Sequence, residues 1–266
     1  MQIEFKNTKN QYVNRSTSND LIDPTQRAWI EVSGNAIENN IKKIKSLLRK
    51  NCKFMAVVKA DGYGHDATFV SKYAIKGGAD QLGVATLCEG ISLRNAGINK
   101  PILVLGNIYC KKDLITCFHY DLMPTISSVR ECLICNNIGK KYHKVFALHL
   151  KVDTGMSRLG FELKDFLHQF KNIQSCENIL IKGIYSHLAS ADEENALDKN
   201  SFTQMQKNKF KDLLKEIKIF RYPEITTHLA NSAGTLLAKE FHFDMVRVGL
   251  SMYGYKPFTS SKMDLT

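Results

Sequence analysis

Several residues that can bind or activate a small molecule follow short apolar runs. The stretch "MAVVKADGYGH" (55–65) carries four apolar residues directly into Lys59, followed by an aspartate and two glycines that flank Tyr63. Burial at the end of an apolar run favours a neutral amine, and a neutral lysine amine is a nucleophile that forms a Schiff base with an aldehyde. The alternative is a lysine whose stem packs in the protein while its ammonium group reaches solvent. This stretch alone leaves the two interpretations equally open.

Two further stretches place ionisable side chains after apolar runs. In "HLKVDTGMSRLGF" (149–161), Lys151 stands near the end of the run and Arg158 follows a break. The guanidinium of Arg158 is a planar, permanently charged fork of donors, although an arginine in a turn is more often structural. In "YSHLASADE" (185–193), His187 follows another run. An imidazole can stack on a flat aromatic cofactor, but a lone histidine is more often a hydrogen-bonded structural residue.

The last two stretches indicate a phosphate site. "HLANSAGTLL" (228–237) puts Asn231 and Ser232 at the expected start of a helix, where free backbone N–H groups favour an anion. An ordinary N-cap is the plain alternative. "VRVGLSMYG" (246–254) supplies Arg247 and Gly249, and glycine permits close approach. Barrels often hold phosphate between the loops after strands seven and eight, which would bring Ser232 and Gly249 together.

Eight apolar runs of strand length alternate with helix-like stretches. The runs lie at 54–60, 81–86, 101–106, 122–126, 145–153, 180–188, 225–232 and 245–250. The clearest helical stretches lie at 66–77, 128–140, 163–176 and 198–219. This alternation indicates parallel β/α units, and eight units favour a closed TIM-type (β/α)8 barrel with the residues above at the carboxyl ends of its strands. An open doubly wound sheet stays possible if the strand count is wrong by one.

Ahead of the barrel, residues 27–33 ("RAWIEVS") alternate like a further strand, and a helix should follow. Asn35 and Glu38 have the spacing of a capping box. The helix should bury a stripe made of Ile37, Ile41, Ile44 and Leu48. Residues 1–26 are polar, contain no apolar segment of signal-peptide length, and are expected to be a disordered leader.

The composition favours a cytoplasmic protein that binds a small molecule. The 266 residues are 44% hydrophobic, enough for a sizeable core, and no apolar run is long enough to cross a bilayer. Seven cysteines, an odd number, indicate a reducing compartment. Cys132 and Cys135 form a lone C-x-x-C, which we interpret as two small apolar residues on a helix and not as a metal site. The net charge of +11 comes from lysines spread along helix faces, which argues against nucleic acid and still favours an anionic ligand.

Five of these stretches together resemble the alanine racemase family of pyridoxal-phosphate enzymes. They are "AVVKADGYGH", "LKVDTGMSRLGF", "YSHLASADE", "HLANSAG" and "VRVGLSMYG", in the family's order. The resemblance covers residues 27 to about 257. It implies a barrel that binds pyridoxal 5'-phosphate and interconverts L-alanine and D-alanine, the latter for cell-wall peptidoglycan. It also implies a homodimer with no nucleic-acid or membrane partner.

The resemblance further implies a role for each residue of the site. Lys59 would hold the cofactor as an internal aldimine and act as one of two opposed bases. Arg158 would bind the cofactor's phenolic oxygen. His187 would pack on the pyridine ring, and Arg247 would face the pyridine nitrogen. The other residues implied at the cofactor are Tyr63, Leu105, Asn231, Ser232, Gly249 and Leu250, with Lys151 aligned to a lysine that is carbamylated in some members.

The chain departs from the family in one respect. The family's second base is a tyrosine of a β-rich domain that follows the barrel and is contributed by the partner subunit, and Tyr253 and Tyr255 lie before its expected position. We therefore expect the barrel at 27–257 and the start of a linker at 258–266, with the strand at 27–33 pairing with an absent domain. The alternatives are a barrel-only carrier of pyridoxal phosphate without racemase activity and, less favoured by the position of Lys59, a cofactor-free Schiff-base aldolase.

Overall fold

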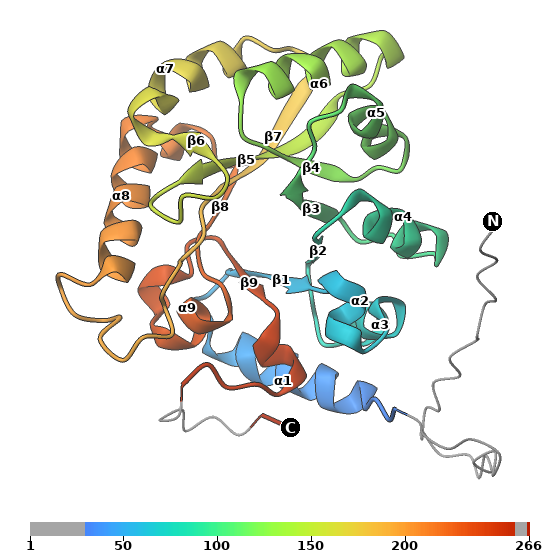
Figure 1. The fold of residues 1–266 in the computed structure, drawn as a ribbon, viewed down its shortest axis with the longest axis vertical. Coiled ribbons are helices and arrows are strands. Elements are labelled where there is room, and N and C mark those ends of the chain that lie inside the picture. The colour runs from blue at the N-terminus through green and yellow to red at the C-terminus, as the bar shows by residue number, and fades with distance from the viewer. Residues whose placement is uncertain (1–29, 259–264) are drawn as a thin grey trace, which may run out of the picture.

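The computed structural model describes residues 30–258 and 265–266, within which eight parallel strands close into a barrel (Figure 1). Its strands are β1 (Lys53–Val57), β2 (Gln81–Val84), β3 (Ile102–Asn107), β4 (Met123–Ile126), β5 (Phe146–Asp153), β7 (Ile179–Tyr185), β8 (Thr226–His228) and β9 (Met245–Val248). The ring closes because β4 pairs with β5 and β1 pairs with β9, both in parallel. All eight predicted runs are therefore strands, the (β/α)8 barrel is confirmed, and the open sheet is excluded.

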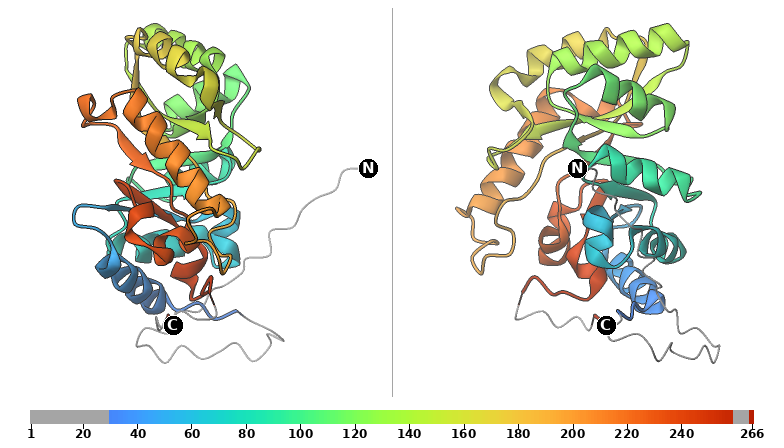
Figure 2. Two further views of the ribbon diagram at one scale, coloured as in Figure 1. Left: turned by 90° about the vertical axis from the view of Figure 1, so that its left-hand side faces the viewer. Right: turned by 45° about the vertical axis from the view of Figure 1, so that its right-hand side comes forward.

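Helices surround the ring of strands (Figures 1 and 2). Those that follow barrel strands are α3 (Ala67–Lys76), α4 (Leu87–Asn95), α5 (Lys111–His119), α6 (Val129–Tyr142), α7 (Leu163–Gln174), α8 (Phe202–Glu216) and α9 (Ser232–Leu237). The four clearest predicted helices correspond to α3, α6, α7 and α8. Short 3-10 turns lie at Ile219–Arg221, Lys239–Phe241 and Leu250–Tyr253. A two-residue strand, β6 (Phe161–Glu162), pairs with the end of β5 and anchors the loop that precedes it.

The helix before the barrel, α1 (Gly34–Leu47), begins two residues earlier than a cap at Asn35 would place it. Its N-cap is Ser33, whose side chain accepts a hydrogen bond from the Ala36 N–H, so the predicted capping box at Asn35 is wrong. Glu38 instead forms an ion pair with Lys42, one turn along the same face. The predicted apolar stripe is confirmed, because the side chains of Ile37, Ile41, Ile44 and Leu48 are all buried.

The strand predicted at 27–33 is not present where the structure describes the chain. Residues 30–33 have no regular secondary structure, while 27–29, the leader at 1–26 and most of the predicted linker fall outside the described residues. A strand needs a hydrogen-bonded neighbour to be stable. The sequence pattern assigned this strand to a sheet in another domain, and no strand within the described part of the chain forms a ladder with 30–33.

The apolar core has two parts, which follow from the alternation of side chains along each strand. The larger part packs the outer face of the strands against the helices and includes Phe54 and Ala56 of β1. The smaller part lies inside the ring and contains Met55, Leu103, Met123, Tyr185 and Met245. Above this inner layer, further along the strands, the inward positions include the polar residues Thr125, Lys151 and Arg247, with Val57 and Leu105 as apolar exceptions. The barrel thus has an apolar floor beneath a polar mouth.

The two cysteines of the C-x-x-C pair lie in the core. Cys132 and Cys135 are fully buried on α6, and burial raises the pKa of both thiols, so they are small apolar core residues as interpreted.

Across residues 30–258 and 265–266, no helix combines the length and apolar character that a membrane crossing requires.

Candidate active site

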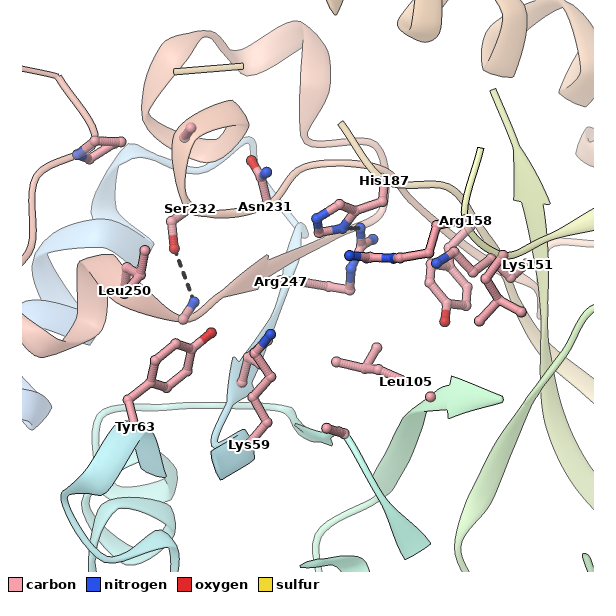
Figure 3. A pocket seen from close by; sticks show the side chains of 18 of the residues that line it. Lys59, Tyr63, Leu105, Lys151, Arg158, His187, Asn231, Ser232, Arg247 and Leu250 are labelled. Atoms are coloured by element: carbon pink, nitrogen blue, oxygen red, sulfur yellow. Dashed lines mark hydrogen bonds between the residues drawn. The ribbon is translucent and has the colours of Figure 1, made fainter. Parts of the chain in front are cut away.

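All eleven residues singled out from the sequence line one cavity of about 640 Å³ at the carboxyl ends of the strands (Figure 3). They come from six different β/α units and meet because parallel strands in a barrel end on the same side. They are Lys59, Tyr63, Leu105, Lys151, Arg158, His187, Asn231, Ser232, Arg247, Gly249 and Leu250. The cavity therefore unites motifs that are nearly 200 residues apart.

The turn that carries Lys59 and Tyr63 has an unusual backbone. Strand β1 ends at Val57, so Lys59 is not the last residue of the strand, as predicted, but the first residue of the turn α2 (Lys59–Gly64). The φ angles are 51° at Ala60, 51° at Asp61, 62° at Gly62 and 55° at Tyr63, which makes this a left-handed turn. Left-handed backbone costs about 1–2 kcal/mol for each non-glycine residue. Strain of this kind persists only where the surroundings impose it.

The left-handed turn aims Tyr63 at the far side of the cavity mouth. Its hydroxyl lies against Gly249, where a Cβ atom would come within 2.6 Å of the tyrosine oxygen. Burial raises the pKa of Tyr63, so its hydroxyl keeps its proton and can donate it. The Lys59 Nζ lies 5.8 Å from the centre of the same ring. The two glycines beside Tyr63 are thus explained by the turn, and Gly249 by the close approach.

The predicted phosphate region contains a hydroxyl with a proton to spare. The Ser232 Oγ accepts hydrogen bonds from the N–H groups of Gly249 (3.0 Å) and Ser251 (3.4 Å). A hydroxyl also donates one hydrogen bond, and no acceptor for the Ser232 proton exists within the part of the chain that the structure covers. Asn231 is the N-cap of α9, and its Oδ1 accepts from Gly234 at 2.9 Å, so its side-chain oxygen has the ordinary capping role.

Arg247 is almost fully buried on β9 without a carboxylate partner among the described residues. Its Nη2 donates two hydrogens to three acceptors, so one hydrogen is shared: the carbonyl oxygens of Ser186 (2.7 Å) and Leu229 (3.0 Å) and the Nδ1 of His187 (3.2 Å). Its Nη1 donates to the Nδ1 of His228 at 2.9 Å. Burial lowers the pKa of Arg247 to about 10, so it remains a cation at neutral pH. Among residues 30–258 and 265–266, one Nη1 hydrogen and the Nε hydrogen of Arg247 have no acceptor, so both can serve a ligand.

The arginine fixes the protonation of its histidine neighbours. A guanidinium can only donate, so the Nδ1 atoms of His187 and His228 must be unprotonated acceptors. Burial first, and then the charge of Arg247, hold the pKa of both histidines well below the usual value. Each ring is therefore neutral and carries its proton on Nε2. The His228 Nε2–H in turn donates to the Nδ1 of His149 at 2.9 Å.

A second layer of side chains supports this network from inside the barrel. The Tyr185 ring stacks on His228 with centroids 4.6 Å apart, and lies 5.0 Å from the Arg247 guanidinium. Its hydroxyl bonds to Thr125 at 2.7 Å, and Thr125 donates to the Val104 carbonyl. His149, Tyr185 and His228 stand at the start of three of the quoted stretches, but no role was predicted from the sequence for them or for Thr125. Their alternation with outward apolar residues along each strand was the available signal.

Lys151 and Arg158 lie on the other side of the cavity. Lys151 is buried on β5, and its Nζ lies 5.6 Å from the Tyr185 ring centre. Burial, followed by the charges of Arg247 and Arg158, lowers the pKa of Lys151 to about 8. Arg158 is exposed in the loop between β5 and β6, and its side chain lies next to that of Lys151 (Figure 3).

The cavity as a whole is cationic. Its described lining contains five basic side chains, Lys59, Lys151, Arg158, Arg247 and Lys256, and one carboxylate, Asp192. Such a concentration of positive charge in a recess favours an anionic ligand. Asp192, Lys256 and Tyr109 of this lining were not named from the sequence, and Tyr255 was named only to exclude it as the second base.

The comparisons with known proteins agree with this geometry. The family model described as "Alanine racemase, N-terminal domain" matches residues 32–257. The alanine racemase of Prochlorococcus marinus is 54% identical over 236 residues, which are 89% of this chain and 61% of that protein. The alanine racemase of Synechocystis is 41% identical, with 87% of this chain and 61% of that protein covered.

Solved structures give the same result. An alanine racemase from Bacillus anthracis with bound L-Ala-P has 33% identity and a TM-score of 0.79, with 88% of this chain and 60% of that chain covered. An alanine racemase of Clostridium difficile 630 in complex with cycloserine has 31% identity and a TM-score of 0.79, with coverage of 86% and 62%. The present chain thus spans about three-fifths of the length of these relatives.

The neutral buried histidines predict how stability depends on pH. Burial lowers the pKa of His149 to about 3, whereas an unfolded histidine titrates near 6.5. The unfolded state therefore binds more protons than the folded state, and the free energy of unfolding falls as the pH drops below about 6.5. Each such histidine contributes about 1.4 kcal/mol per pH unit to this slope. We expect His149→Gln, which keeps an acceptor for His228, to reduce the slope by about one histidine in urea unfolding between pH 6.5 and 5. An unchanged slope would mean that His149 is protonated in the folded protein.

Proposed function

Since this chain belongs to the family of alanine racemase N-terminal domains, we propose that its cavity binds pyridoxal 5'-phosphate at Lys59 and serves the interconversion of L- and D-alanine. The observation that carries the proposal is the joint placement of an amine and a phosphate site. Lys59 and the group formed by Tyr63, Ser232 and Gly249 line the same mouth, with His187 and Arg247 also in the lining. An aldehyde with a phosphate arm matches both ends of this arrangement.

The donor set fits the cofactor. The Ser232 O–H and the Tyr63 O–H are donors for phosphate oxygens, and the cationic lining suits a dianion. His187 offers a neutral ring that can pack on a pyridine. Arg247 keeps two unengaged hydrogens, one of which can point at a ring nitrogen. When bound, the cofactor supplies an aldehyde carbon that links to amines and a ring that withdraws electrons from the substrate Cα.

Arg247 affects this chemistry because its guanidinium does not readily give up or accept a proton. Its pKa, about 10, keeps it protonated, so it would donate a hydrogen bond to the ring nitrogen of the bound cofactor and would not deliver or accept a full proton. Beside this arginine, the electron withdrawal that the bound cofactor supplies would be weaker than beside a carboxylic acid, and return of the proton to Cα would be favoured over transamination. The carbonyl and histidine contacts of Arg247 hold the guanidinium in this orientation.

Arg158 and Lys151 lie on the side of the cavity away from Ser232 and Gly249, where the phenolic oxygen of the cofactor would lie in our proposal. Arg158 can donate to the phenolic oxygen of the cofactor. Lys151 has a pKa of about 8, so a fraction of its amine is neutral near pH 7 and can add carbon dioxide with loss of a proton. The resulting carbamate would be an anion between Arg158 and Arg247, and it would brace Arg158. We include this modification in the proposal.

Racemisation needs a base on each face of the Cα plane, and Lys59 serves one. In our proposal the other is a tyrosine from a second domain, supplied by the partner in a homodimer of the full-length enzyme. Tyr253 does not serve, because it is half-buried with its hydroxyl directed at the Val57 carbonyl (3.4 Å). Tyr185 does not serve either, because it is buried and bonded to Thr125.

The first test identifies the lysine. Purified protein incubated with pyridoxal phosphate and reduced with borohydride should carry the label on Lys59, because that amine shares the mouth with the phosphate donors. Lys59→Ala should abolish the label and also the visible absorbance band of the Schiff base between the lysine and pyridoxal phosphate. Lys53→Ala, at the exposed start of the same strand, should leave both unchanged. Peptide mass mapping that places the label on another lysine would refute the proposal.

The second test addresses the phosphate end. In Gly249→Ala the new methyl group must displace the Tyr63 hydroxyl, which lies 2.6 Å from the Cβ position. Affinity for pyridoxal phosphate should fall roughly tenfold or more, the value of one hydrogen bond to a charged group. Coupling to pyridoxal, which lacks the phosphate, should change little. An equal loss for both aldehydes would show that Tyr63 does not bind the phosphate.

The third test determines whether this chain supplies one or both of the bases that racemisation needs. With Lys59 as the single base, residues 1–266 in heavy water should introduce deuterium at Cα of one alanine enantiomer. This exchange should exceed conversion to the other enantiomer by about 100-fold or more, the contribution of one general base. Rapid conversion of L- to D-alanine by this chain would contradict the assignment of the second base. Exchange into neither enantiomer, with Lys59 labelled, would identify the protein as a carrier of the cofactor.

A further inference from the structure

A carboxylate outside the cavity lining contacts the peptide group that follows Lys59. Glu89 is the third residue of α4, and its backbone and side chain form a capping box with Thr86. Its Oε2 accepts hydrogen bonds from the N–H groups of Ala85 (2.6 Å) and Thr86 (3.1 Å). Its Oε1 accepts from the Ala60 N–H at 2.8 Å. The Ala60 nitrogen belongs to the peptide bond between Lys59 and Ala60, so one carboxylate joins the end of β2 to the start of the left-handed turn.

We propose that Glu89 is a positioning residue, which holds the left-handed turn and thereby sets where the Lys59 amine and the Tyr63 hydroxyl enter the cavity. Its consequence for cofactor binding rests on the function proposed above, whereas the contact with Ala60 does not. Glu89 is not in the cavity lining, so it acts through the backbone.

The strain of the turn makes such an anchor necessary. The backbone from Ala60 to Tyr63 is left-handed at every residue, and only Gly62 adopts that conformation without steric cost. The N–H of Gly62 bonds to the Val58 carbonyl (2.9 Å), and the Asp61 carboxylate accepts from the Ala67 N–H (2.9 Å). These two contacts hold the middle and the exit of the turn. Glu89 holds its entry, which is the end that carries Lys59.

The chemistry of the contact requires a carboxylate. All three partners of Glu89 are N–H donors, and an ionised carboxylate accepts on both oxygens. A glutamine in the same place would have one acceptor oxygen and one NH2 group. The NH2 group would face either Ala60 or the pair Ala85 and Thr86, donor against donor. Glu89→Gln therefore preserves size and removes one side of the bridge.

The chain contains a matched control for the capping role. Glu131 is the third residue of α6, where the Ser128 hydroxyl accepts from its N–H (3.3 Å) and its Oε2 accepts from the Ser127 N–H (2.8 Å). Glu131 thus bonds, as Glu89 does, to the N–H of the residue before the N-cap, but it makes neither a bond to the N-cap N–H nor a bond to the Lys59 turn. Comparison of Glu89→Gln with Glu131→Gln separates loss of a helix cap from loss of the anchor.

The experiment uses residues 1–266 with each substitution and two readouts. The first is amide hydrogen exchange of the segment containing Ala60, measured without cofactor. The second is the rate and affinity with which pyridoxal phosphate couples to Lys59. Glu89→Gln should accelerate Ala60 exchange and weaken coupling, each roughly tenfold, the scale of one hydrogen bond to a charged acceptor. Glu131→Gln should lower the melting temperature similarly and leave both readouts near wild type.

Other outcomes overturn the proposal. Unchanged Ala60 exchange in Glu89→Gln would show that the contact does not hold the turn, and faster exchange with normal coupling would show that the contact does not position Lys59. Equal effects from the two glutamine variants would reduce Glu89 to a helix cap. If Glu89→Gln fails to fold, Glu89→Asp, which keeps the charge but shortens the reach, decides by the same two readouts. Failure of the unsubstituted chain to couple at Lys59 would refute the proposed function, and the exchange comparison would still decide on the anchor.

Discussion

The parallel pairing of β1 with β9 fixes the position of the Lys59 amine relative to the proposed phosphate site at Gly249. In this register Met55 lies opposite Arg247, and Ala56 lies opposite Val248. The chain leaves β1 into the turn of Lys59 and leaves β9 into Gly249, so amine and phosphate site emerge from neighbouring strands. A slip of one residue would turn Arg247 out of the barrel and its apolar neighbours in. The closed ring prevents such a slip, because every strand is held on both sides.

Arg247 shows how the barrel accommodates a buried charge without a counterion. Removal of a guanidinium from water is costly unless its hydrogens find acceptors. Here carbonyl oxygens at the ends of β7 and β8 and two neutral histidines provide them. The same contacts keep His187 and His228 unprotonated and orient the rings around the cavity. A carboxylate at any of these places would neutralise the arginine and change the ring chemistry that we propose.

The sequence predicted the architecture well because the signals for it were local and repeated. Most of the barrel strands are largely buried on both faces, so they appear as short apolar runs, and eight runs separated by helices leave few alternatives. The first half of β7, with Leu180 and Lys182 exposed, is the exception. The cavity lining was also predictable, since Lys59, His187 and Arg247 stand in recognisable motifs. The left-handed turn could be anticipated only in part from Gly62 and Gly64. The capping residue of α1 was misplaced, because Ser33 and Asn35 are both good caps and the choice depends on where the helix packs.

Contacts between distant segments were beyond the reach of sequence patterns. The bond from Glu89 to Ala60 joins residues of two β/α units, and in the sequence Glu89 reads only as a capping glutamate. The stack of Tyr185 on His228 likewise depends on the register of β7 with β8. Such interactions follow from the closure of the barrel and not from the spacing of residues within a motif.

The central claim is that Lys59 and the Gly249 region hold the two ends of one ligand. A crystal structure of this chain grown with pyridoxal phosphate tests it most directly. The claim predicts continuous electron density from the Lys59 Nζ to the cofactor, with the phosphate against Tyr63, Ser232 and Gly249 and the ring beside His187. Density that joins the cofactor to another lysine, or a phosphate bound away from Gly249, would contradict it.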